Sequence, residues 1–148
     1  MRIVSLVPSL TEYLWALGLD TEVVGITKFC VHPQVWKQTK AKVGGTKKVN
    51  FEAIHKLVPD LIIANREENT KEDIALLEQH FEVLLTDINS LEQAYAYLLL
   101  IGERVGKKTE AEQLLLQIQT QFQSVAQIGQ GASFLYLIWK DPYFVVGP

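Results

Sequence analysis

The stretch Val43–Asn69, VGGTKKVNFEAIHKLVPDLIIANREEN, carries the signals that predict the fold. Two glycines open it, at a point where the chain must turn or admit a close neighbour. Asn50 then precedes a short amphipathic helix as an N-cap residue, and Pro59 ends that helix. The apolar run Leu61–Ala64 predicts a buried strand, and the polar loop 65–69 follows it. A buried strand that ends in a polar loop is how open α/β sheets build ligand sites.

The rest of the chain alternates short apolar runs with amphipathic segments. We expect strands at Ile3–Val7, Glu22–Ile26, a short piece ending at Val43, Asp60–Ala64, Val83–Thr86 and Ser133–Trp139. We expect helices at 9–17, 35–39, 50–56, 70–80, 90–105 and 109–128. Ser9 with Glu12, and Thr109 with Glu112, match the S/T-x-x-E pattern of a capping box. Strands that alternate with helices predict an α/β domain with a mostly parallel sheet.

Composition excludes several function classes. The net charge is −3 with no basic stripe, which argues against nucleic-acid binding. The apolar runs are too short to span a bilayer, and the single cysteine excludes an internal disulfide. Arg2 followed by the short run Ile3–Val7 does not form an export signal. The chain as written is therefore expected to be cytoplasmic, or periplasmic or otherwise extracytoplasmic if a leader was removed.

Five short motifs occur in a characteristic order: PSLTE, VVGIT, VGG, NFEAI and PDLIIA. Together with KFCVHP and IANREEN, they resemble the class III periplasmic binding proteins, the helical-backbone metal receptors, and among these the cobalamin-binding type. The resemblance implies a Rossmann-like lobe (1–90), a helical segment with a long inter-lobe helix (91–130) and the first strand of a second lobe (131–148). It also implies that the chain is part of a longer two-lobe protein. The apolar strand at 134–139 would then need a partner, either the sheet of the first lobe or another copy of the chain in a homodimer.

Ligand-binding candidates lie in the loops that follow the strands, and two aromatic residues of the second lobe join them. Arg66 could pair with a carboxylate or phosphate, and Lys47 could contact an anionic ligand. In the cobalamin-binding proteins that the chain resembles, aromatic residues at the positions of Thr46 and Asn65 flank the ligand. The candidates are Pro8, Ser9, Lys28, Phe29, His32, Thr46, Lys47, Asn65, Arg66, Glu67, Trp139 and Tyr143.

Cys30 and His32 lie two residues apart but lack the further ligands of a closed zinc site. We interpret Cys30 as a small buried hydrophobe. His32 is either an ordinary loop residue or, as the resemblance implies, an axial ligand to the metal of a bound chelate. The resemblance also implies that Glu52, in the pattern Asn50-Phe51-Glu52-Ala53-Ile54, docks onto an ABC permease. The alternative role of Glu52 is a helix-end charge.

Three functions follow from these observations. The first is the substrate-binding component of an ABC importer for a corrinoid, haem or ferric siderophore, with the ligand held between two lobes. The second is a soluble chelate-binding or sensing module without a transporter. The third, a small cysteine-dependent enzyme, lacks any recognisable base or oxyanion site. We expect a binding protein with no catalytic residues and no intrinsic cofactor.

Overall fold

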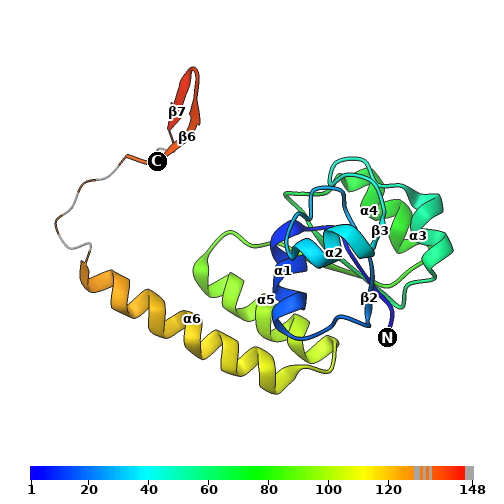
Figure 1. The fold of residues 1–148 in the computed structure, drawn as a ribbon, viewed down its shortest axis with the longest axis horizontal. Helices are drawn as coiled ribbons and strands as arrows, with labels where there is room; N and C mark the ends of the chain where they lie inside the picture. The colour runs from blue at the N-terminus through cyan, green and yellow to red at the C-terminus, as the bar shows by residue number, and fades with distance from the viewer. Residues whose placement is uncertain (129–130, 132, 134, 146–148) are drawn as a thin grey trace. The chain divides into compact units, whose positions relative to one another are not determined.

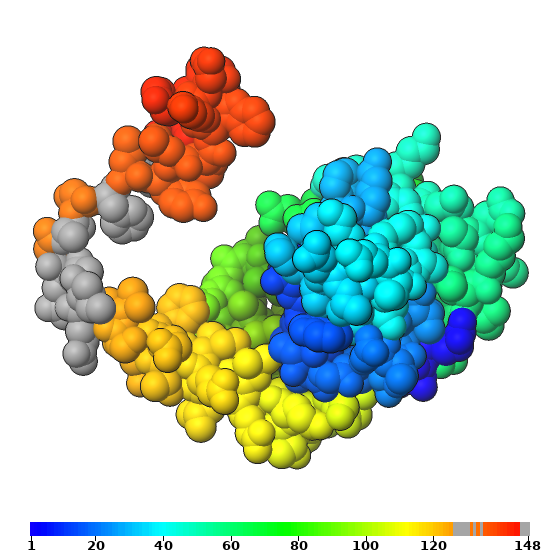
Figure 2. All heavy atoms as spheres, viewed as in Figure 1, coloured from blue at the N-terminus to red at the C-terminus, as the bar shows by residue number. Residues whose placement is uncertain are grey.

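The computed structural model describes residues 1–128, 131, 133 and 135–145 (Figures 1 and 2). It divides into two compact units, Met1–Leu115 and Leu116–Pro148, and each is described by itself. None of the helices among the described residues combines the length and apolar character that crossing a membrane requires.

The first unit is built on one five-stranded sheet with the order β3-β2-β1-β4-β5. The strands are β1 (Ile3–Ser5), β2 (Val23–Ile26), β3 (Ala41–Lys42), β4 (Leu61–Asn65) and β5 (Val83–Thr86). All four neighbouring pairs are parallel. The predicted α/β architecture with a parallel sheet is therefore confirmed.

Helices cover both faces of this sheet, because successive strand residues point to opposite sides. In β4, Leu61 and Ile63 join one apolar cluster, and Ile62 and Ala64 join the other. The first cluster also contains side chains of α1, α2, α5 and the start of α6, and the second contains side chains of α3 and α4. The helices are α1 (Pro8–Ala16), α2 (Gln34–Thr39), α3 (Phe51–Leu57), α4 (Lys71–Glu78), α5 (Leu91–Arg104) and α6 (Lys108–Ile128).

Helix starts agree with the sequence in three places and differ in two. The side chains of Asn50, Thr70 and Ser90 cap α3, α4 and α5, each by accepting a main-chain N–H three residues later. The capping box predicted at Ser9 is wrong. Pro8, whose missing N–H and fixed φ suit the first helical turn, starts α1 one residue earlier.

The capping box predicted at Thr109 is also wrong. Helix α6 begins at Lys108, so Thr109 lies inside the first turn. The main-chain N–H of Ala111 donates to the carbonyl of Lys107, 3.0 Å away, which sets the start of the helix before Thr109.

The second unit contains the later part of α6 and an antiparallel hairpin of β6 (Leu137–Lys140) and β7 (Tyr143–Val145). The sequence predicted one strand over Ser133–Trp139, and this was wrong in extent. The strand starts at Leu137 and pairs along one edge with the apolar piece that follows the turn. Position 134 of the predicted strand lies outside the described residues.

Candidate functional site

Five loops leave the carboxyl ends of the strands at one edge of the sheet, as they must when all strands are parallel. We call them the carboxyl-edge loops: 6–8, 27–33, 43–50, 66–70 and 87–90. Main-chain hydrogen bonds connect two of these loops to a neighbouring loop or strand end. The N–H of Lys28 donates to the carbonyl of Gly44 at 2.8 Å, and the N–H of Arg66 donates to the carbonyl of Thr86 at 2.9 Å.

Asn69 joins three of these segments through one buried side chain that is 4% exposed. Its Oδ1 accepts from the main-chain N–H of Asn65 at 2.9 Å. Its Nδ2 donates to the carbonyl of Thr46 at 2.9 Å and lies 3.5 Å from the carbonyl of Leu6. Sequence analysis did not select Asn69, because nothing in a run of five polar residues marks which one turns inward.

The loop 43–50 folds back on itself. The N–H of Gly45 donates to the carbonyl of Lys48, and the N–H of Asn50 donates to the carbonyl of Val43, both at 2.8 Å. Gly44 has φ +98°, and a Cβ there would lie 2.7 Å from main-chain atoms of Asn50 and Lys48. Only glycine fits this close approach, which the Gly-Gly pair predicted.

Two predicted ligand-binding residues, Thr46 and Asn65, are buried. The Asn65 carbonyl oxygen Oδ1 accepts from the main-chain N–H groups of Glu67 and Glu68, at 2.9 and 3.1 Å. Its Nδ2 donates to the hydroxyl of Thr86 at 3.0 Å. These contacts make Asn65 part of the framework that shapes the loops, and a role in ligand contact stays a prediction.

The other predicted residues of the first unit are more open to solvent. Lys28, Phe29, His32, Lys47, Arg66, Glu67 and Ser9 are exposed, and Pro8 is half-buried. Arg66 pairs with Asp87 at 3.2 Å, and the ammonium of Lys47 donates to the carbonyl of Glu67. Asp87 was missed by sequence analysis, although its place directly after β5 matches the rule used for the other strands.

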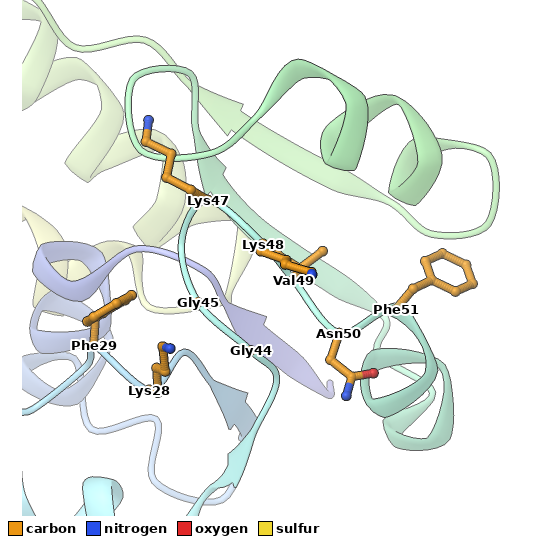
Figure 3. A pocket seen from close by; sticks show the side chains of 9 residues that line it. All are labelled: Lys28, Phe29, Gly44, Gly45, Lys47, Lys48, Val49, Asn50 and Phe51. Carbon is orange, nitrogen blue, oxygen red and sulfur yellow. The ribbon is translucent and has the colours of Figure 1, made fainter.

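A groove with a volume of about 490 Å³ lies between the loop after β2 and the loop 43–50 (Figure 3). Lys28 and Phe29 lie on one side of it, and Lys47 and Lys48 come from the opposite loop. Gly45 gives the Phe29 ring room, because a Cβ at Gly45 would lie 3.2 Å from Phe29 Cε2.

Cys30 is fully buried, as predicted, and its thiol lies 3.1 and 3.2 Å from the hydroxyls of Thr11 and Thr27. His32 is exposed, so the two side chains do not share an environment. Among the described residues, no three His, Cys, Asp or Glu side chains come together as a metal site. A single axial ligand at His32 stays a prediction.

Trp139 and Tyr143 belong to the hairpin of the second unit, and both are largely exposed. They line a surface hollow together with Leu137, Ile138 and Lys140. Their predicted role as ligand contacts stays a prediction.

Glu52 lies on the first turn of α3, where its carboxylate pairs with Lys56 at 2.7 Å and both side chains are exposed.

The sequence profile of the family described as "Periplasmic binding protein" matches residues 3–135. The chain belongs to this family. It is 33% identical over 130 residues to the uncharacterized ABC transporter substrate-binding lipoprotein YvrC of Bacillus subtilis. The alignment covers 85% of this chain and 41% of YvrC. The family resemblance predicted from the motifs is thus confirmed, and the family is one of binding proteins.

Solved structures give the same fold. The periplasmic vitamin B12 binding protein BtuF of Vibrio cholerae superposes with a TM-score of 0.83 at 23% identity, covering 96% of this chain and 57% of BtuF. A periplasmic heme binding protein from Pseudomonas aeruginosa gives 0.79 at 26% identity, covering 92% and 52%. The chain thus spans about half the length of these relatives.

Proposed function

We propose that this chain is a ligand-binding lobe, with the start of a second lobe, of the substrate-binding component of an ABC importer for a metal chelate. Family membership supports a binding role, and the ABC transporter name of YvrC supports the importer. The names of the B12- and haem-binding relatives support a chelate as the ligand. The observation that carries the proposal is that all five parallel strands end at the same side of the sheet, where Asn69 joins three of the loops.

Calorimetric titration of the protein with cyanocobalamin, haemin and a ferric siderophore tests the proposal. We expect saturable binding of at least one chelate, accompanied by a change in its visible absorption. Absence of binding by every chelate would contradict the proposal. The other interpretation, a sensing module without a transporter, predicts chelate binding without capture by a permease.

An importer component meets its ligand outside the cytoplasmic membrane, so we place this protein there. Its family is periplasmic, and YvrC is named a lipoprotein. Fractionation of the producing cells checks this, with an extracytoplasmic pool as the expected result. Recovery only from the cytoplasm would favour the sensing module instead.

We also propose that Glu52 contacts the permease. It lies on the exposed side of α3 and is 79% exposed, and its carboxylate pairs with Lys56 on the same helix. Replacing Glu52 by Gln should leave chelate affinity unchanged and weaken capture by the permease, most strongly at low salt. Glu72→Gln is the matched control, because Glu72 is another exposed carboxylate in a first helical turn. Equal capture by both variants would reduce Glu52 to a helix-end charge.

A homodimer through the hairpin is a further proposal. Ile138, Trp139, Tyr143 and Phe144 are each more than half exposed, which is a large apolar area for one short hairpin. Sedimentation should then show self-association that increases with concentration, and replacing Trp139 by Ser should reduce it. A monomer at all concentrations would contradict the proposal.

A further inference from the structure

The groove between Lys28 and Lys48 concentrates positive charge in a protein of opposite overall charge. Nine residues line it, three of them are lysines, and none is acidic. The whole chain carries a net charge of −3. A hollow lined by one sign of charge attracts ligands of the other sign and raises their local concentration.

Two of the three lysines are available for a ligand. Among the described residues, neither Lys28 nor Lys48 forms an ion pair with a carboxylate. Lys47 donates to a main-chain carbonyl, which leaves its charge unneutralised. Arg66, by contrast, is already paired with Asp87. The positive charge of the carboxyl edge therefore lies mainly at the groove.

An aromatic ring lies among these charges. Phe29 is 53% exposed, and the ammonium of Lys28 lies 5.1 Å from the centroid of its ring. The absence of a side chain at Gly45 lets the ring and the Lys28 stem pack against the loop 43–50. The groove thus presents a flat apolar surface beside cations, which suits a ligand with both an apolar face and anionic groups.

We propose that this groove recognises the negative charges at the periphery of the chelate, so that the protein selects anionic metal chelates over a neutral corrinoid. Lys28 and Lys48 contact carboxylates or similar anionic groups of the ligand, and Phe29 packs against its apolar part. The inference rests on the proposed function and names the ligand class for the same site. The shared chemistry is a metal chelate with peripheral anionic groups, whether planar or not.

The test compares three probes: haemin, which is planar and dicarboxylic; ferric citrate, which is anionic and not planar; and cyanocobalamin, which has no net charge. We expect haemin or ferric citrate to bind at least about tenfold more tightly than cyanocobalamin, with affinity that falls as salt increases. Tight haemin binding with weak citrate binding shows that Phe29 adds to the charge. Comparable binding of both anions shows that charge alone suffices.

The double variant Lys28→Gln/Lys48→Gln removes the two unpaired cations of the groove. We expect about a tenfold or larger loss of affinity for the anionic probe and a smaller salt dependence. The control Lys37→Gln/Lys108→Gln removes the same charge from exposed positions outside the groove and should change neither. Circular dichroism confirms that each variant is folded.

Three results would overturn the inference, and they differ in whether the proposed function survives. Cyanocobalamin bound more tightly than both anions, or anion binding unchanged in the groove variant, would refute the groove and leave the proposed function intact. Failure of the unaltered protein to bind any of the three probes would refute the proposed function as well.

Discussion

Asn69 provides the sharpest test of how the carboxyl edge is held together, through the variant Asn69→Ala. The change removes an acceptor for the Asn65 N–H and a donor to the Thr46 carbonyl, both 2.9 Å from the amide. Asn65, Thr46 and Asn69 are all buried. A buried polar group left without a partner costs about 1–3 kcal/mol. We therefore expect a loss of about 2–4 kcal/mol in the free energy of unfolding. This is less than the upper limit for two unpaired groups, because water that enters the space can bond to them in part.

Urea denaturation measures this loss, and Asn89→Ala is the matched control. Asn89 is exposed, and its side chain donates to Asp87 at 2.9 Å, so its removal should change stability by less than about 0.5 kcal/mol. Hydrogen exchange gives a local check, because the Asn65 amide should exchange faster in Asn69→Ala. A loss below about 1 kcal/mol, with the Asn65 amide still protected, would refute the view that Asn69 joins the loops.

Four further results are expected. Gly44→Ala should destabilise the protein by at least about 1 kcal/mol in urea, because the added Cβ meets main-chain atoms at φ +98°, and equal stability would contradict the close fit. Burial raises the pKa of Tyr13 to about 12, so its stabilising contribution is complete below about pH 10 and is lost as the pH rises through 12; Tyr13→Phe should lack this loss. His32→Ala should alter the visible spectrum of a bound cobalt or iron chelate, and an unchanged spectrum would make His32 an ordinary loop residue. Gly102→Ala should destabilise the α5–α6 contact, since the new Cβ would lie 2.3 Å from Ala111 Cβ, which thermal unfolding would show.

The sheet could be predicted because its evidence is local and apolar. In β4, four consecutive apolar residues divide between the two faces of a buried strand, and proline and glycine mark where neighbouring helices stop. Helix caps were predictable where a single side chain decides, as at Asn50. The cap predicted at Ser9 was wrong, because proline is favoured at the first helical position and Pro8 starts the helix there.

The hairpin could not be predicted in full from a run of apolar residues. Leu137–Lys140 and Tyr143–Val145 flank a two-residue turn, and either could have been a lone strand that pairs elsewhere. Strand pairing depends on contacts between segments, whereas a single sequence shows only the segments. The placement of the loops was predictable, because parallel strands bring their carboxyl ends to one edge.

Sequence reasoning treated the polar residues of the loops as one class, and the structure divides them into two. Asn65 and Asn69 are buried amides that bond to the loops themselves, and Thr46 is a buried residue whose main-chain carbonyl accepts from Asn69. Lys28 and Lys48 are exposed, and among the described residues they form no ion pairs. Exposed substitutions typically change stability by less than about 0.5 kcal/mol, whereas buried polar groups cost several times more. The proposed role of the exposed lysines in ligand choice can therefore be tested by replacement at little cost in stability, whereas replacing the buried amides should disturb the loops.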